Sequence, residues 1–344
     1  MSDTKVLFVV NALSGGGAEG SALSVFHALQ TQGKDINLIA INRTPDDSND
    51  VSDSITLLNR NWKSGPVQTV RAYISFIREL DKLKPDLVVA HCELPELFCA
   101  FMPRMRTGVI AVEHTSNPWA GRKLLGIITR VALKFRRTSW VTVNKSQNQI
   151  WFGESNPIVI NNPVVKNEKI APTKIEEKIV FIGRLRGEKR PEWAINAAIS
   201  SSIPIGVIGN GELMQMLIED NLHQKELVKF YGYIKNPWAL LSQNTLVVMP
   251  SKYEGDGLVA VEAIINGFPI VLADNEDLRR FGLPSANYFS GEIELERILQ
   301  RVKQEGVSAF RTPDSLITKM QIERDIRTIT AKWIQILKLD VASI

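Results

Sequence analysis

Short apolar runs alternate along the chain with longer stretches in which apolar residues recur at helical spacing. Such runs are typical of strands buried on both faces of a parallel sheet, and amphipathic stretches are typical of the helices that cover it. We therefore predict strands at residues 6–10, 36–41, 87–90, 107–112, 141–143, 158–163, 179–182, 205–208, 228–232, 245–249 and 269–273. The repeated order of strand, helix and strand predicts an α/β protein built on parallel sheets.

The length of the chain indicates two such sheets. At 344 residues, with 44% hydrophobic and 23% charged residues, the sequence has room for two globular domains of roughly 150 residues each. A segment rich in Pro, Lys and Glu at residues 163–174 is the expected linker, so we place the domain boundary between Asn162 and Pro163. A capped helix is expected directly after Asn144.

Composition argues against several classes of protein. The two cysteines, Cys92 and Cys99, lack the spacing of a zinc site or a disulfide framework, and without a secretory leader they fit a reducing cytoplasm. No apolar run approaches the ~18 residues of a membrane-spanning helix. The net charge of +4, all of it within residues 1–164, is compatible with an anionic partner. It is too small to indicate nucleic acid, and no basic motif interleaved with aromatic residues occurs.

The most informative stretch, residues 249–269, contains a strand end, a loop and the start of a helix. Glu254 lies in the loop, and Glu262 lies about two turns away along the helix. The first amides of the helix, at Gly257 and Leu258, face the gap between them, where the helix dipole favours an anion. Amides for a diphosphate and two carboxylates for hydroxyl groups suit a nucleotide-sugar.

The same stretch resembles a known family. The spacing Glu254-x7-Glu262, followed by Ala263, Gly267 and Pro269, resembles the signature of the retaining GT-B glycosyltransferases of family four, also called glycosyl transferases group 1. The resemblance implies two Rossmann-like, doubly wound domains that face each other across a cleft. It also implies that the second domain binds a nucleotide-sugar, expected to be a UDP-sugar.

The resemblance assigns the donor loop. Its members here are Glu254, Gly255, Asp256, Gly257, Leu258 and Glu262, with Glu254 also at the reaction centre. Asp256 departs from the family, which often has an apolar or aromatic residue between these glycines. A carboxylate at this position either repels the diphosphate or caps the helix.

Residues 183–189 resemble the Gly-Arg-Leu-x-x-x-Lys motif of the same family, whose cations grip the diphosphate. Arg184 and Lys189 match it, although Arg190 stands where the family often has Gly. No Asp-x-Asp occurs, so we expect a metal-independent enzyme without a cofactor, in which these two cations and the helix dipole stabilise the leaving group. By resemblance the nucleotide also contacts Gly209, Tyr233 and Ile234.

The first half supplies the remaining candidates. The glycine-rich turn after the first strand, with Gly16 and Gly17, resembles the Gly-Gly-x-Glu-Arg turn that borders the diphosphate and the acceptor, and Glu19 stands on its acceptor side. Gly20 replaces the usual arginine. Glu113 and His114 follow a strand directly; by resemblance the histidine contacts the donor sugar during catalysis and Glu113 lies on the acceptor side. A weaker candidate is His91, which also follows a strand.

Residues 121–137 predict a basic amphipathic helix. Leu124, Ile128, Val131 and Phe135 share one face, expected to pack on the sheet, and a solvated stripe is expected at Lys123, Arg130, Lys134 and Arg137. Such a stripe could hold the chain at an anionic membrane. Together with the resemblance, it predicts a cytoplasmic enzyme, peripheral at the inner face of the plasma membrane, that acts on a glycan or polyprenyl-linked glycan acceptor.

The predicted organisation is an acceptor-side domain at residues 1–162, a nucleotide-sugar domain at 163–325 and a C-terminal helix, 326–344, that by resemblance crosses back to the first domain. The predicted activity is hexosyl transfer in the biosynthesis of a surface polysaccharide such as lipopolysaccharide or capsule. One alternative is a nucleotide-sugar 2-epimerase, for which we place no acid and base carboxylates. Another is a nucleotide-sugar-binding subunit without turnover, suggested by the departures at Gly20 and Asp256.

Overall fold

The computed structural model describes residues 4–14, 16–44, 52–61, 65–103, 107–144, 157–166 and 175–342. The chain divides into two compact units: unit 1 comprises Met1–Pro163 with Arg324–Ile344, and unit 2 comprises Val164–Glu323. The first division falls one residue after the position expected from the sequence. Most of the expected linker, at residues 167–174, and the helix expected after Asn144 lie outside the described residues.

Seven strands of unit 1 form a parallel sheet in the order β3-β2-β1-β4-β5-β6-β7. They are β1 (Val6–Val10), β2 (Ile36–Arg43), β3 (Ile55–Asn61), β4 (Leu87–His91), β5 (Gly108–Glu113), β6 (Ser139–Thr142) and β7 (Ile158–Val159). The strand order reverses between β1 and β4, and ligands of open α/β sheets bind outside the carboxyl ends of strands at such a reversal. The pattern analysis missed β3, because this edge strand is half-buried and largely polar.

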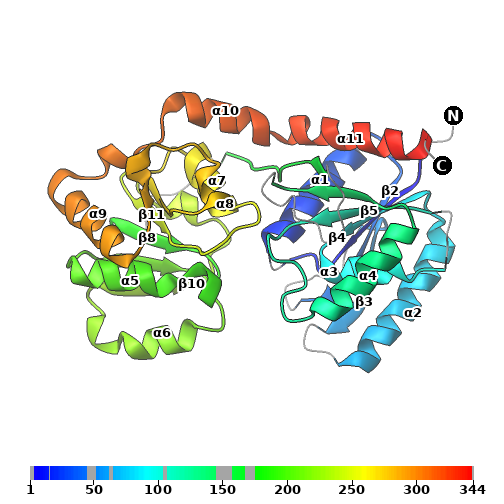
Figure 1. Ribbon diagram of the computed structural model, residues 1–344, viewed down its shortest axis with the longest axis horizontal. Helices are drawn as coiled ribbons and strands as arrows, with labels where there is room; N and C mark the ends of the chain where they lie inside the picture. The colour runs from blue at the N-terminus through cyan, green and yellow to red at the C-terminus, as the bar shows by residue number, and fades with distance from the viewer. Residues whose placement is uncertain are drawn as a thin grey trace. The chain divides into compact units, whose positions relative to one another are not determined.

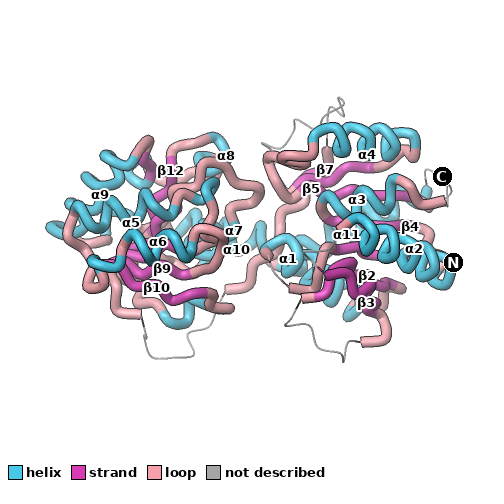
Figure 2. Tube along the Cα trace, turned by 90° about the horizontal axis from the view of Figure 1, so that it is seen from below, coloured by secondary structure: helices cyan, strands magenta, loops and turns pink. Residues whose placement is uncertain are grey.

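The helices of unit 1 cover both faces of its sheet (Figure 1). They are α1 (Gly17–Thr31), α2 (Pro66–Leu83), α3 (Glu93–Ala100), α4 (Lys123–Phe135) and α11 (Ile326–Ala342). Buried residues of α1 and α11 share one hydrophobic cluster with the sheet, and those of α2, α3 and α4 share a second one on the opposite face. The strands of unit 1 therefore lie between two helical layers. Figure 2 shows the strands of the chain in magenta and its helices in cyan.

The C-terminal helix belongs to the core of unit 1. The helix predicted at residues 326–344 corresponds to α11, and Asp325 separates it from α10 (Asp314–Arg324), of which all but Arg324 belongs to unit 2. Ile329, Trp333, Ile336 and Leu337 of α11 are buried with β1 and α1, beside which the helix lies in Figure 1.

Unit 2 repeats the same plan. Its parallel sheet has the order β10-β9-β8-β11-β12-β13, with β8 (Ile179–Ile182), β9 (Ile205–Ile208), β10 (Val228–Gly232), β11 (Leu246–Met249), β12 (Ile270–Ala273) and β13 (Tyr288–Phe289). The strand order reverses between β8 and β11. No strand was predicted after residues 269–273, but β13 follows and pairs with β12.

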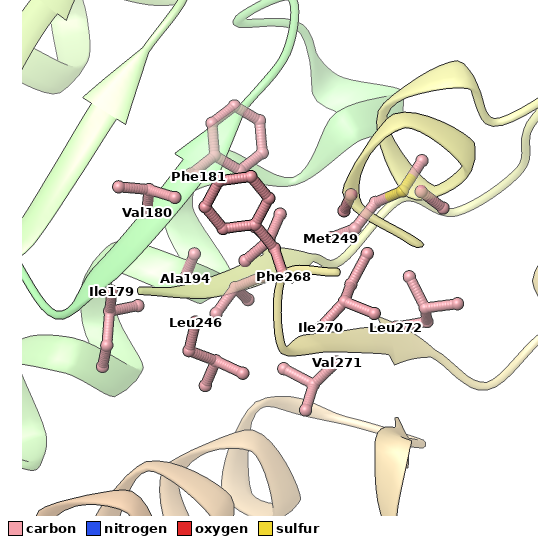
Figure 3. Close-up of a cluster of buried hydrophobic side chains, with 14 of the residues drawn as sticks. Ile179, Val180, Phe181, Ala194, Leu246, Met249, Phe268, Ile270, Val271 and Leu272 are labelled. Carbon is pink, nitrogen blue, oxygen red and sulfur yellow. The ribbon is translucent and has the colours of Figure 1, made fainter. Parts of the chain in front are cut away.

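The α-helices of unit 2 besides α10 are α5 (Pro191–Ser200), α6 (Met214–Asp220), α7 (Leu258–Ile265), α8 (Glu276–Arg279) and α9 (Glu292–Glu305). Short 3₁₀ turns lie at Gly187–Lys189, Leu222–Gln224, Pro237–Leu240, Ser285–Asn287 and Ser308–Phe310. Apolar side chains of β8, β11 and β12 form one buried cluster with Ala194 of α5 and with Phe268, which precedes β12 (Figure 3). Two Rossmann-like parallel-sheet domains are thus confirmed.

Helix α4 corrects a prediction about its faces. The apolar face expected on the sheet is exposed: Phe135 is 80% exposed and Leu124 71%, and Ile128 and Val131 are also exposed. Arg130, expected in the solvated stripe, is 1% exposed and forms ion pairs with Glu96 and Glu113. The periodicity of apolar residues predicts no cation on the buried face of α4. The helix is rotated about its axis relative to that prediction because the two buried carboxylates need a cation as their partner.

Candidate functional site

Four predicted binding turns of unit 2 stand at one edge of its sheet. Gly183 and Arg184 follow β8, Gly209 follows β9, and Tyr233 follows β10. The loop of Glu254 follows β11, which pairs with β8. Because β10, β9, β8 and β11 are consecutive parallel neighbours, their carboxyl ends lie at the same edge, on either side of the strand-order reversal.

Two predicted donor residues are in direct contact at this reversal. Lys189, at the end of a 3₁₀ turn, has its Nζ atom 2.6 Å from Oε1 of Glu254. Glu254 is 7% exposed, and its backbone N–H donates to Asp277 Oδ2 at 2.9 Å. The fold thus joins the turn after β8 to the loop after β11 and sets a cation and a carboxylate side by side.

The glycines of these turns allow the backbones after β8 and β9 to approach each other closely. Gly209 has φ +142°, and a Cβ there would lie 1.8 Å from the carbonyl oxygen of Gly183. Gly211 is equally restricted, with its Cβ position 2.3 Å from the Leu185 carbonyl oxygen. Only glycine fits both positions, which accounts for the Gly-x-Gly spacing at the end of β9.

The N-terminus of α7 is arranged for an anion. Gly257 is the N-cap in the left-handed region, and the first helical bonds are donated by Ala260 and Val261 to its carbonyl oxygen. The amides of Gly257 and Leu258 therefore precede the helical ladder. Asp256 stands next to them, but Arg280 lies 3.2 Å from its Oδ1 atom, so its charge is balanced within the protein. That pairing weakens the expected repulsion of a diphosphate.

Glu262 is held by a residue that sequence reasoning missed. Trp238 Nε1 donates to Glu262 Oε2 at 2.7 Å, and the indole is 3% exposed and packs on Phe268 at 5.3 Å. Burial raises the pKa of Glu262, and the hydrogen bond from Trp238 opposes this shift. One oxygen is thereby fixed by the protein. Nothing in the separation of 24 residues indicated this contact.

The other expected donor contacts in unit 2 lie on the segments that follow β8, β10 and β11. Arg184 is exposed, and Tyr233 is 75% exposed just beyond β10. Ile234 packs partly against the core of unit 2. Gly255 lies in the loop between β11 and α7. Their roles stay predictions.

In unit 1 the expected turn residues lie at the start of α1. Gly16 is the N-cap, Gly17 is the first helical residue and Glu19 lies in the first turn, partly exposed. His114 directly follows β5 and is half-buried, with its Nε2 atom 3.0 Å from Nδ1 of His91. His91 was the weaker sequence candidate, yet it is the residue that contacts His114.

Glu113 requires a correction. It was expected on the acceptor side, but it is 4% exposed and its carboxylate pairs with Arg130 inside unit 1. Oε1 of Glu96 lies 3.5 Å from the same guanidinium nitrogen. Burial raises the pKa of both carboxyls, that of Glu96 to about 8, while Arg130 lowers both. Glu113 therefore holds α4 against β5 rather than facing a substrate.

A metal site is not apparent in the parts of the chain that the structure describes: they contain no cluster of three His, Cys, Asp or Glu residues that could hold an ion. Independence of metals stays a prediction. The chemistry assembled in unit 2 is that of anion binding, with Lys189 and the first amides of α7 as donors.

Two family models match the chain. That described as Glycosyl transferases group 1 matches residues 165–281, and that described as Glycosyltransferase Family 4 matches residues 15–150. The chain is a group 1 glycosyltransferase. It is therefore a transferase enzyme, and the resemblance to this family first drawn from the two glutamates of residues 249–269 is confirmed, whereas retention of anomeric configuration stays a prediction.

Relatives of this group 1 glycosyltransferase match most of its length. It is 25% identical to an uncharacterized glycosyltransferase of Haemophilus influenzae, over 77% of this chain and 78% of the relative. It is also 25% identical to the UDP-Gal:alpha-D-GlcNAc-diphosphoundecaprenol alpha-1,3-galactosyltransferase of Escherichia coli, over 75% and 76%. The crystal structure of Anabaena HepE in complex with UDP and glucose superposes with a TM-score of 0.75 at 16% identity, over 97% and 99%. The last similarity supports the GT-B fold.

Proposed function

We propose that this glycosyltransferase moves a hexosyl group from a UDP-sugar to a lipid-linked glycan, with retention of anomeric configuration, in surface polysaccharide biosynthesis. The observation that carries the donor part is the pairing of Lys189 with Glu254 at the strand-order reversal of unit 2, at the same sheet edge as the N-terminal amides of α7. A cation, a carboxylate and the first amides of a helix at one edge suit a nucleoside diphosphate-sugar.

Each group then has a role. Lys189, Arg184 and the amides at Gly257 and Leu258 stabilise the departing diphosphate. Glu262 binds ribose hydroxyls with the oxygen that Trp238 leaves available, and Glu254 binds the sugar. The anomeric C–O bond to the diphosphate breaks and a C–O bond to the acceptor hydroxyl forms on the same face. The hydroxyl proton passes to the departing diphosphate, so the step balances without a metal.

The names of the similar proteins support the choice of substrates. The Escherichia coli relative is named for a UDP-galactose donor and a diphosphoundecaprenol-linked acceptor, and the HepE structure contains UDP and glucose. Purified chain should consume a UDP-sugar and extend a synthetic polyprenyl-diphosphate-linked sugar. Binding of UDP with neither transfer nor hydrolysis would indicate the binding subunit instead.

Glu262→Gln should weaken UDP binding about 10-fold to 100-fold, because it removes a charge-assisted hydrogen bond to ribose of roughly 1.5 to 3 kcal/mol. Trp238→Phe should have a smaller effect in the same direction, since it frees the carboxylate to rotate. Isothermal titration with UDP measures both, and Glu226→Gln, an exposed glutamate of the same unit, is the matched control. Wild-type affinity for UDP in Glu262→Gln would reject the ribose-binding role of Glu262. It would not contradict the proposed transferase function.

The exposed surface of α4 suits binding to a membrane. We define the α4 surface by its exposed apolar residues, Leu124, Ile127, Ile128, Val131 and Phe135. Lys123 and Lys134 on the same helix are exposed. An apolar strip with cations on the same helix suits the interface of an anionic bilayer, where each cation contributes about 1 kcal/mol. No helix within the described residues is long and apolar enough to cross a bilayer.

Flotation with vesicles tests this partner. Leu124→Asp combined with Phe135→Asp should release the chain from anionic vesicles, because burial of each side chain is worth roughly 1.5 to 3 kcal/mol. The matched control is Val67→Asp with Val70→Asp, which alters apolar residues of α2 that are 66% and 57% exposed. Equal recovery of both double variants and the wild type would exclude the α4 surface as the membrane contact.

A further inference from the structure

Two histidines meet at the carboxyl edge of the unit 1 sheet. His91 ends β4, and His114 directly follows β5, the neighbouring strand. Their rings are stacked, with centroids 5.3 Å apart and an interplanar angle of 30°. His91 Nδ1 lies 3.0 Å from His114 Nε2, so a single hydrogen bond joins the two rings. One nitrogen of that bond carries the proton and the other accepts it.

His91 belongs to the interior. It is 4% exposed, and its ring packs against Phe8 at 5.2 Å and against Trp333 of α11 at 6.1 Å. Burial, with a smaller contribution from His114, lowers the pKa of His91 well below its usual value. The ring is therefore neutral at physiological pH and carries one proton, on either Nδ1 or Nε2.

The hydrogen bond couples the tautomers of the two rings. When His91 donates from Nδ1, a neutral His114 carries its own proton on Nδ1; when His114 donates from Nε2, His91 carries its proton on Nε2. Either direction places a proton on an outer ring nitrogen that is buried. Two neutral rings joined by this bond therefore share one tautomer, both Nδ1–H or both Nε2–H.

We propose that His91 is a positioning residue, whose hydrogen bond holds the ring of His114 in one orientation for its encounter with the donor sugar. The proposal rests on the proposed transferase function, because it is His114 that is expected at the reaction centre. His91 itself touches no substrate. It acts through a bond that can form only because β4 and β5 are adjacent and because Trp333 packs against its ring.

Three variants separate a positioning role from a purely structural one. His91→Phe keeps an aromatic ring against Phe8 but cannot hydrogen-bond, and should lower kcat about tenfold or more with little change in the KM for donor. His91→Asn places an amide near the former Nδ1 atom and should restore most of kcat. His27→Asn, at an exposed histidine of α1, is the control and should behave as wild type. Wild-type kcat in His91→Phe would overturn the proposal, as would equal losses in His91→Phe and His91→Asn.

A measurement without substrate keeps this test independent of the transferase assignment. The chain has four histidines, so ¹⁵N labelling of histidine with long-range proton correlation resolves each tautomer. In the wild type, His91 and His114 should appear in the same tautomer, either both Nδ1–H or both Nε2–H, and His91→Phe should change the ¹⁵N shift of His114 Nε2. Different tautomers in the two wild-type rings, or an unchanged His114 in His91→Phe, would overturn the proposal. The expected tautomers in a protein that lacks transfer activity would support the His91 contact and reject the proposed function alone.

Discussion

Replacing Arg130 by methionine should lower the free energy of unfolding of unit 1 by about 3 to 5 kcal/mol, because it leaves buried carboxylates without their cation. Arg130 is 1% exposed and is the ion-pair partner of both Glu96 and Glu113. Its guanidinium also lies over the ring of Trp140, at 4.9 Å from the centroid. Methionine fills a similar volume, so the loss would come mainly from the charge. Urea unfolding followed by tryptophan fluorescence measures it.

Lys134→Met is the matched control for this substitution. It removes one positive charge from the same helix at an exposed position and should change stability by less than about 0.5 kcal/mol. Adding Glu113→Gln to Arg130→Met should recover part of the loss, because the amide still accepts the hydrogen bond from the backbone N–H of Thr115 without carrying a charge. Equal stability of Arg130→Met and Lys134→Met would mean that the buried ion pairs are not what holds α4 in place.

The same arginine shows where sequence patterns stop being informative. Strands such as β1, β4 and β11 are uniformly apolar because both faces of the sheet are covered, so the pattern fixes their positions. Helix α4 has an apolar face that is exposed and a cation that is buried. Its orientation depends on Glu96, 34 residues away, and periodicity within one helix contains no information about such a partner.

The candidate site divides in a similar way. Lys189 and Glu254 could be predicted because each stands at a fixed offset from a strand end, and the order of the strands then brings them together. Trp238 and Arg280 could not, since each acts through a side chain that meets the site from another element. His91 was a candidate because it stands at a strand end, but its bond to His114 could not be predicted. Motif spacing identifies the groups that follow strands; the residues that orient them depend on tertiary contacts.

Arg190 departs from the family's glycine and has a strained backbone conformation. It stands where the family often has glycine, and its backbone has φ +49° and ψ +48°, a left-handed conformation that costs a non-glycine residue about 1 to 2 kcal/mol. Its guanidinium lies 4.3 Å from the ring centroid of Trp193, a cation–π contact that partly offsets this strain. The turn that carries Lys189 therefore keeps its shape without the glycine.

Lys189→Met should lower kcat about 100-fold to 1,000-fold, the usual loss when one fixed donor to a developing anion is removed. In the structure without ligand this ammonium is paired with Glu254, which places a charge at the strand-order reversal where the diphosphate is expected. Because that charge acts mainly on the departing diphosphate, kcat should fall more than affinity for the UDP-sugar. Lys225→Met, an exposed lysine of the same unit, is the control, and Lys189→Arg should retain intermediate activity. Should Lys189→Met lose stability yet keep the kcat of Lys225→Met, the contact with Glu254 would be a structural ion pair, and the leaving group would have to be stabilised by Arg184 and the amides of α7.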